Sequence, residues 1–375
     1  MKFFLASTSI VAACAKSTQE EDVNRINSVQ SLWKAGYPAK FQNQARGSYI
    51  KDLCGVKDHD ETGSVLKKRA NDPNDELFQM GPLYTGGNLP DNFDSAENWP
   101  QCAKIIDDIR DQSHCGCCWA FGAASVASDR ACISTNATIS LPLSAQDTCF
   151  NSQPNGCGGG GLDTPFQYFH DTGVVTGTQQ LDDISDEASD PFDGANLCSA
   201  FSLPHCHHHG PIKDGDPYPS EGDENCPDGM ESPDPFDQCD SNAVSPHADF
   251  ASDKVGFTGT VFHYPFDVDT IKNAIMTGGP VETAMTVYAD FEDYTEGIYN
   301  ATTDEVIGGH AVRIVGWGTD EESGVEFWKV ANSWNIFWGE KGFIRIVSGI
   351  NLGGLEQNIV ASSADAVWGY MKDLQ

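Results

Sequence analysis

The chain has 375 residues, 39% of them hydrophobic, with 22 basic and 55 acidic side chains. This apolar fraction suffices for a sizeable core and excludes global disorder. At about 100–200 residues per domain, the length fits two or three domains or one two-lobed enzyme with an extension. The net charge of −33 repels phosphate backbones, so we expect no nucleic-acid partner. Because no apolar run reaches the roughly 18 residues of a membrane-spanning helix, we expect no membrane span.

The negative charge is concentrated in the later part of the chain. Residues 16–88 hold ten basic and ten acidic side chains, whereas residues 89–375 hold 11 basic and 45 acidic ones. A near-neutral leader followed by a strongly acidic body indicates two parts with different fates. An acidic body suits an acidic compartment, where protonation of carboxylates reduces self-repulsion.

The first 15 residues have the pattern of a secretory signal peptide, with a frayed amino terminus as the alternative. Lys2 precedes an apolar stretch, and Ala13-Cys14-Ala15 fits the small-x-small rule for cleavage. Of 13 cysteines, eleven lie between 102 and 239. In a secreted protein such a cluster indicates disulfides, whereas in a cytosolic one it more often binds metal. Two glycosylation sequons, at Asn136 and Asn300, agree with secretion.

The predicted elements form a helical part followed by a β-rich part. An amphipathic segment at about 23–33 predicts a helix, and residues 71–88 indicate an exposed linker. Residues 118–132 are compatible with a helix, and residues 181–240, rich in Asp, Pro and Gly, predict a loop. Alternating stretches at 311–317, 326–331 and 342–347 predict strands. This order is typical of the α+β class.

Four side chains have the types that cysteine-based hydrolysis requires: a thiol, a base, a group that orients the base, and a donor for the oxyanion. Cys118 begins a helix-compatible run, and the partial positive charge at a helix N-terminus lowers a thiol pKa. We expect His310 to supply the imidazolium, and Asn332 to hold it in one tautomer behind the shield of Trp334. We expect Gln112 to donate its amide to the oxyanion beside the Cys118 N–H.

The segments around these residues resemble papain-like cysteine peptidases, whose nucleophile lies in C-G-[SA]-C-[WY] with a histidine and an asparagine later in the chain. Other segments are similar to the cathepsin B branch: residues 89–102, 109–112, 128–132, 279–281 and 331–334, with 32–36 and 53–55 in the leader. The resemblance covers roughly residues 23–360.

The resemblance implies an α+β, two-lobed papain-like fold, with a helical left lobe, a β-barrel-like right lobe and the active-site cleft between them. Residues 1–15 would be a signal peptide, 16–88 an inhibitory propeptide lying through the cleft in reverse, and 89–375 the mature peptidase. It also implies protein and peptide substrates, a monomer, and neither metal nor organic cofactor. The implied substrate contacts come from Gly159, Gly160, Ala311 and Trp334.

Residues 198–240 correspond to the occluding loop of the cathepsin B branch. In that branch a His-His pair binds the terminal carboxylate of a substrate and favours removal of dipeptides, which implies this role for His208 and His209. A solvated or adventitious metal-binding histidine run is the alternative. We expect His208 to pair with Asp111. The implied disulfides are Cys102–Cys132, Cys115–Cys157, Cys149–Cys226 and Cys198–Cys239.

Several departures from the branch affect this loop and the active-site strip. Phe337 replaces an Asp that pairs with a loop Arg, Lys213 lies near but not at the place of that Arg, and Cys206 lacks the partner that closes the loop. We therefore expect a loop that opens readily and activity shifted toward endopeptidase cleavage. Cys117 stands where the branch usually has Ser, which is a redox liability beside the nucleophile.

The second specificity pocket also differs. The acidic residue at its base aligns with Asn358, although Glu356 is nearby. A neutral pocket with Leu162 and Ala311 would favour apolar side chains over Arg.

We therefore expect a cathepsin B-like cysteine peptidase made as a zymogen in the secretory pathway, destined for the lysosome or vacuole or for the outside medium. One alternative is thiol–disulfide exchange by residues 115–118, which would need neither Gln112 nor the His310 and Asn332 pair. Another is a catalytically silent binding homologue, which the presence of all four residue types disfavours.

Overall fold

The computed structural model describes residues 19–37, 48–57, 64–178, 196–203, 231–362 and 365–369. Its helices are α1 Gln19–Val29, α2 Ser48–Leu53, α3 Ser64–Ala70, α4 Ser95–Asn98, α5 Ala103–Ile106, α6 Cys118–Ser134, α7 Ala145–Asn151, α8 Asp163–Asp171 and α9 Val268–Gly278. Its strands are β1 Trp33–Ala35, β2 Phe78–Met80, β3 Phe93–Asp94, β4 Val255–Phe257, β5 Val261–Tyr264, β6 Val281–Tyr288, β7 Tyr294–Tyr299, β8 Val306–Thr319, β9 Glu326–Ala331, β10 Phe343–Val347, β11 Ile359–Ser362 and β12 Ala366–Trp368. Within these ranges, no helix has the length and apolarity needed to cross a membrane.

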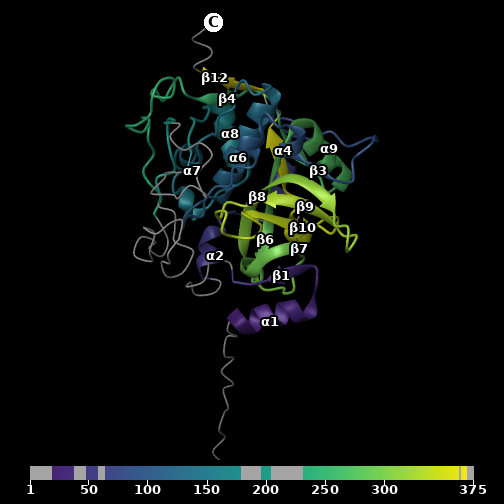
Figure 1. The fold of residues 1–375 in the computed structure, drawn as a ribbon. Coiled ribbons are helices and arrows are strands. Elements are labelled where there is room, and N and C mark those ends of the chain that lie inside the picture. Colours follow the sequence, from purple (N-terminus) through teal and green to yellow (C-terminus); the bar gives the residue numbers. More distant parts are fainter. Residues whose placement is uncertain are drawn as a thin grey trace, which may run out of the picture.

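Helix α6 forms the centre of the molecule. Every residue from Cys118 to Cys132 is buried, and apart from Asp129 and Arg130 the sequence is apolar or small, which is typical of a helix surrounded by protein. Helices α7 and α8 lie on one side of it, and strand β8 lies on the other (Figure 1). The predicted helix at 118–132 is confirmed.

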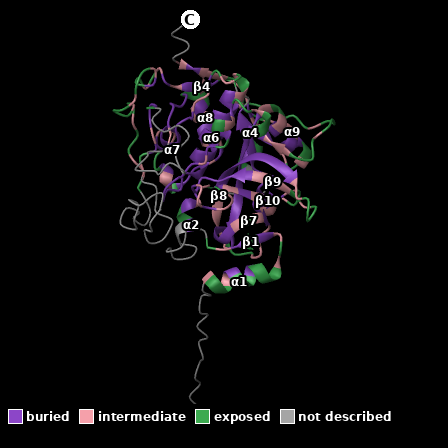
Figure 2. Cartoon of the chain, in the orientation of Figure 1, coloured by how far each residue is buried: buried purple, intermediate pink, exposed green. Residues whose placement is uncertain are grey.

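The β-rich lobe is built on one mixed sheet. Its strand order is β1-β7-β10-β9-β8-β6-β11-β5-β2, with β3 added beside β8. The 14-residue strand β8 pairs antiparallel with both β6 and β9, and its residues 310–318 are all buried (Figure 2). The outermost described strands, β1 and β2, do not pair with each other, so the described sheet is open rather than a closed barrel. The predicted strands at 311–317, 326–331 and 342–347 are confirmed within β8, β9 and β10.

Each lobe has its own core. One cluster of buried side chains joins the sheet to α1, α2 and α9 and includes the indole rings of Trp328, Trp334 and Trp338. The other joins α6, α7 and α8 and includes Trp119 and Phe166. The molecule is thus an α+β protein with a helical lobe and a β-rich lobe, as expected.

The leader packs on the body instead of forming a free extension. Helix α1 lies beside β1 at the edge of the sheet, and β1 pairs with β7 of the body (Figure 1). Trp33, expected at the end of a helix, is therefore in a strand, where its buried ring contacts Tyr299.

The prediction of an exposed linker at 71–88 is wrong for its middle part. Phe78 is fully buried, and β2 pairs in parallel with β5. The guanidinium of Arg69 lies 3.8 Å from the centre of the Phe78 ring and hydrogen-bonds to Asp163 of α8. These contacts with distant parts of the chain, which turn chemistry alone does not reveal, hold the segment in place.

Three expected disulfides are present in the structure, namely Cys102–Cys132, Cys115–Cys157 and Cys198–Cys239. The fourth expectation is corrected: Cys149 is bonded to Cys117, not to Cys226. The reason is that α7 places Cys149 against the residue that precedes α6. Cys206 and Cys226 lie outside the described residues, whereas Cys54 and Cys118 are free thiols.

Candidate active site

Cys118 is the first residue of α6, and it is fully buried beneath the leader. The backbone N–H of Gly55, a leader residue, donates to its Sγ at 3.3 Å. A Cβ on Gly55 would lie 1.8 Å from the carbonyl oxygen of Gly116, so only glycine allows this close approach. The leader thus covers the nucleophile at van der Waals distance.

His310 lies on β8, and Asn332 directly follows β9. The β8–β9 pairing brings them together, and His310 Nε2 lies 2.8 Å from Asn332 Oδ1. The buried ring of Trp334 packs on the imidazole with 4.7 Å between ring centres. This arrangement fixes the imidazole plane and shields the His–Asn hydrogen bond from water, in agreement with the expected role of Trp334.

Gln112 hydrogen-bonds to a carbonyl of the leader. Its Nε2 donates to Leu53 O at 2.9 Å and to Cys115 O at 2.8 Å. The Gln112 side chain is oriented by Ser333, whose Oγ donates to Gln112 Oε1 at 2.7 Å. Ser333 N also donates to Asn332 Oδ1 at 2.8 Å. Sequence reasoning missed this role of Ser333, although the residue lies in the Asn-Ser-Trp segment that marks the site.

After helix α2 the leader continues through the site as a short segment that contacts both walls. Val56 forms a parallel bridge with Gly160, and Val56 N donates to Gly309 O at 3.0 Å on the opposite wall. Gly160 N donates to Gly55 O at 2.8 Å, and Lys57 N donates to Gly160 O at 3.0 Å. The leader is therefore hydrogen-bonded through its backbone to both walls of the site.

The pKa of the Cys118 thiol is raised to about 11, chiefly by burial. Backbone N–H groups of Ala311, Gly55 and Trp119 lower it, while the buried Glu282 raises it. The expectation that the helix N-terminus keeps this sulfur as a thiolate is therefore not met in the leader-covered form, because loss of hydration outweighs the nearby dipoles. The leader thus lies over the nucleophile, and burial of the thiol raises its pKa.

The comparisons with known proteins agree with this geometry. The model of the papain family of cysteine proteases matches residues 89–363. The chain belongs to the papain family. It is similar to cathepsin B-like cysteine proteinases 6 and 5 of Caenorhabditis elegans, at 38% and 35% identity, covering 94% and 92% of this chain and 84% and 89% of those relatives.

Solved zymogen structures are similar along nearly the whole chain. The proCathepsin B S9 from Trypanosoma congolense is 26% identical with a TM-score of 0.68, covering 92% of this chain and 97% of that one. A recombinant stem bromelain precursor, 18% identical with a TM-score of 0.58 over 92% and 89% of the two chains, shows the fold alone. The chain is thus a cathepsin B-like, cysteine-type peptidase with a papain-like fold and a bound leader.

Three other residues that the family resemblance implied for the site lie in the described part of the chain. Gly159 contacts Gln153, whose Nε2 donates to its carbonyl at 2.7 Å. Ala311 is buried in the wall between the lobes. Asp111, the expected loop anchor, accepts from Ser113 N at 2.8 Å and lies 3.2 Å from Asn335 Nδ2. The other loop residues, His208, His209 and Lys213, lie outside the described residues.

The carboxylate of Glu356 does not face a substrate pocket. It accepts hydrogen bonds from the Trp328 indole at 2.7 Å and from Gly349 N at 2.7 Å. Asn358 donates to Gly354 O at 3.1 Å. Glu356 thus anchors the turn before β11, and the acidic group expected nearby is committed to structure.

One group of described side chains has the proximity of a metal site. The sulfurs of Cys115, Cys117 and Cys149 lie within 4.8 Å of one another. All three are in disulfides, so they offer no thiolate to a metal. Of the glycosylation sequons, Asn136 is exposed and Asn300 is half-buried.

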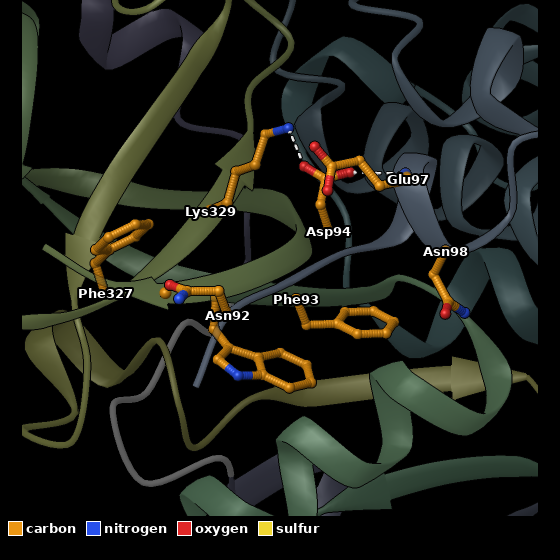
Figure 3. A pocket seen from close by; sticks show the side chains of 9 residues that line it. Asn92, Phe93, Asp94, Glu97, Asn98, Phe327 and Lys329 are labelled. Carbon is orange, nitrogen blue, oxygen red and sulfur yellow. Dashed lines mark hydrogen bonds and ion pairs between the residues drawn. The ribbon is translucent and has the colours of Figure 1, made fainter. Parts of the chain in front are cut away.

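A surface pocket of about 470 Å³ lies away from this site (Figure 3). Its walls come from β3, α4, β9 and the end of β8, with Phe93 stacked on Trp317. Among its lining residues, Lys329 pairs with Asp94. None of the four catalytic candidates lines this pocket.

Proposed function

We propose that the activated enzyme hydrolyses peptide bonds through a thioester on Cys118. The supporting observation is that two leader residues close together in sequence contact the two groups. Gln112 binds the Leu53 carbonyl, and the N–H of Gly55, two residues later, contacts the Cys118 sulfur. A substrate carbonyl in the same place lies beside the nucleophile and an oxyanion donor at once.

The reaction follows from the positions of four side chains. The Cys118 sulfur attacks the carbonyl, and Gln112 and the Cys118 N–H stabilise the oxyanion. His310 then gives its proton to the leaving amine, while Asn332 keeps the imidazole in place. Water hydrolyses the thioester with His310 acting as base, which restores the thiol.

We propose that residues on the acyl side of the substrate lie along Gly159 and Gly160. The leader residue at this place is Val56, which packs with the apolar cluster containing Leu162 and Ala311. Since Glu356 is occupied elsewhere, the second pocket favours apolar side chains over Arg. Blocked internal peptides with Val or Arg before the residue at the scissile bond measure this preference.

We further propose that the protein is a secreted or lysosomal zymogen that acts as a monomer, with residues 16–88 as its inhibitor. Endopeptidase activity predominates. Carboxydipeptidase activity requires that the enzyme bind the free C-terminal carboxylate of a substrate. The acidic body supports an acidic destination, because the repulsion among its carboxylates decreases there.

Replacement of single cysteines in the full chain tests the mechanism. After removal of the leader by an added protease, Cys118→Ser is expected to lose at least about 10⁴-fold in kcat/KM on blocked peptides. Cys54→Ser is the matched control, because Cys54 leaves with the leader. An epoxide inhibitor is expected to label Cys118, as mapped by mass spectrometry. Turnover of disulfides without peptide cleavage would support the exchange alternative, and absence of label would support a silent homologue.

A further inference from the structure

His114 lies in the loop between the oxyanion residue and the nucleophile, and the leader supplies a carboxylate to it. His114 Nε2 is 2.9 Å from Asp52 Oδ2, and the histidine side chain is only 3% exposed. Asp52 comes from α2 of the leader and is about half exposed. Removal of the leader takes this carboxylate away from Nε2.

The course of the leader shows on which side of the scissile bond this contact lies. Leu53 O accepts a hydrogen bond from Gln112 Nε2, the proposed oxyanion donor, and the chain then continues to Val56 and Lys57 along Gly160. Asp52, which precedes Leu53, contacts His114, whereas the residues that follow Leu53 contact Gly160. If Gly160 binds the acyl side of a substrate, as proposed above, Asp52 marks the side of the leaving group.

Covalent distance identifies which carboxylate of a substrate would reach the same place. From the Leu53 carbonyl carbon to the Asp52 carboxyl carbon the path crosses Leu53 Cα, Leu53 N, Asp52 C, Asp52 Cα and Asp52 Cβ, which is six bonds. From a scissile carbonyl carbon to the terminal carboxyl carbon of a two-residue leaving group is also six bonds. A one-residue leaving group ends after three bonds, and a longer one ends farther away. The Asp52 carboxyl, held at the end of helix α2, is therefore as many bonds from the carbonyl on Gln112 as a dipeptide terminus is from the scissile carbonyl.

We propose that His114 is a specificity-determining residue that binds the C-terminal carboxylate of a dipeptide leaving group. This inference rests on the proposed function and assigns to the body of the enzyme a carboxylate contact separate from His208 and His209. A histidine N–H to a carboxylate is a charge-assisted hydrogen bond when the ring is protonated, and it is stronger than a neutral one. In the zymogen, Asp52 occupies this contact.

Matched peptide pairs test the proposal on the activated enzyme. Each pair has the same acyl side and a two-residue leaving group that ends in a free carboxylate or in a carboxamide. We expect kcat/KM for the carboxylate to exceed that for the amide by about tenfold, which corresponds to about 1.4 kcal/mol. The same comparison on one-residue leaving groups is expected to give a ratio near one. A ratio near one for the dipeptide pair contradicts the proposal.

Variants then locate the contact. His114→Leu is expected to reduce the carboxylate-to-amide ratio to near one; the ratio is the readout because it cancels any overall change in activity. His170→Leu is the matched control, since His170 also lies 2.8 Å from an aspartate but on α8. Retention of the ratio in His114→Leu, or its loss only when His208 and His209 are replaced, overturns the proposal.

Two further measurements distinguish a bound chain terminus from a bound side chain and from an inactive enzyme. Two carboxamide peptides that end in Asp or in Asn test whether the contact binds a side-chain carboxylate. If the enzyme prefers the Asp peptide but does not prefer a free C-terminal carboxylate over a carboxamide, the proposal is contradicted. Failure to cleave any peptide would instead refute the proposed function.

Inhibition by a leader peptide tests the same contact without comparing the turnover of different substrates. A synthetic peptide of residues 48–57 is expected to inhibit the activated enzyme about tenfold more strongly with Asp52 than with the substitution Asp52→Asn. With the His114→Leu enzyme, the two peptides are expected to inhibit equally. Equal inhibition of the unsubstituted enzyme by both peptides would overturn the inference.

Discussion

At the residue scale, Ser333 joins the two amides that the chemistry requires. It donates through Oγ to Gln112 and through its N–H to Asn332, while its carbonyl accepts from Gln112 N at 2.9 Å. One residue thus orients the oxyanion donor of the helical lobe and the histidine partner of the β-rich lobe. Its hydroxyl makes it a positioning residue, because it acts through Gln112.

Loss of this hydroxyl should affect the transition state more than substrate binding. We expect Ser333→Ala to lower kcat about tenfold with little change in KM, since a hydrogen bond of about 1–1.5 kcal/mol that orients Gln112 is lost. Steady-state kinetics of the activated enzyme measure this. Ser323→Ala, in the turn between β8 and β9, is the control. A rise in KM with unchanged kcat would contradict the positioning role.

At this scale the sequence predicts the catalytic residues better than it predicts the disulfide pairing. Cys118, His310, Asn332 and Gln112 are recognisable because their chemistry restricts the residue types and their order. The bond between Cys117 and Cys149 was not predicted, because it depends on how α7 packs against the start of α6. The raised pKa of Cys118 was also missed, since it arises from the complete burial of the thiol in the folded chain.

At the scale of elements, Gly122 allows α6 to lie against β6. A Cβ at this position would lie 2.6 Å from Glu282 Oε1. The Glu282 carboxyl is completely buried, and burial raises its pKa well above the ordinary value. The glycine therefore makes room for a buried carboxyl group between the catalytic helix and the sheet.

Filling this space should destabilise the protein despite a better helix former. Ala favours a helix over Gly by about 1 kcal/mol, whereas overpacking costs about 1–3 kcal/mol. We expect Gly122→Ala to lower the free energy of unfolding, and Gly122→Ala with Glu282→Ala to cost less than the sum of the single changes. Urea unfolding measures these effects. Gly256→Ala, where no heavy atom lies within 4 Å, is the control, and additivity would refute the clash.

Element prediction succeeded where the pattern is local and failed where it is not. The run of small apolar residues in α6 and the alternation in β9 identify these elements from sequence alone. Strand β2 was predicted as linker because three residues between turn-forming segments carry no periodicity. Only pairing with β5 and burial of Phe78 make it a strand.

At the scale of the whole molecule, an ion pair joins the two lobes. Asp129 on α6 accepts from Arg313 on β8 at 2.6 Å, and both side chains are buried. Burial raises the pKa of Asp129 to about 6 in spite of the arginine. The folded protein therefore retains the Asp129 proton at pH values where the unfolded chain has lost it.

The sign of the resulting pH dependence follows from linkage. Between about pH 4 and pH 6 the folded state binds more protons at Asp129 than the unfolded state, so stability decreases as pH rises. We expect this decrease to reach at most about 3 kcal/mol and to be absent in Asp129→Asn, giving the variant a flatter curve. Urea unfolding of the Cys118→Ser zymogen at pH 4, 5 and 6 measures it. Parallel curves for the two proteins would contradict the assignment.

The leader connects all three scales, since a few of its residues change the chemistry of the whole enzyme. It places Leu53 O on Gln112, Gly55 N on the sulfur and Asp52 on His114. Its binding in the cleft follows the family resemblance, but the contact with His114 depends on the folded loop. The same contacts that block the substrate also remove water from Cys118.

The most direct measurement is the rate at which iodoacetamide alkylates Cys118 as a function of pH, before and after removal of the leader. A Cys54→Ser background removes the other free thiol of the described chain, and mass spectrometry reports the site. The zymogen is expected to react slowly at pH 6 and to gain reactivity only toward pH 11. The activated enzyme is expected to react rapidly at pH 6, and His310→Ala should abolish that gain. Equal rates at pH 6 before and after leader removal, or full reactivity without His310, would contradict the mechanism.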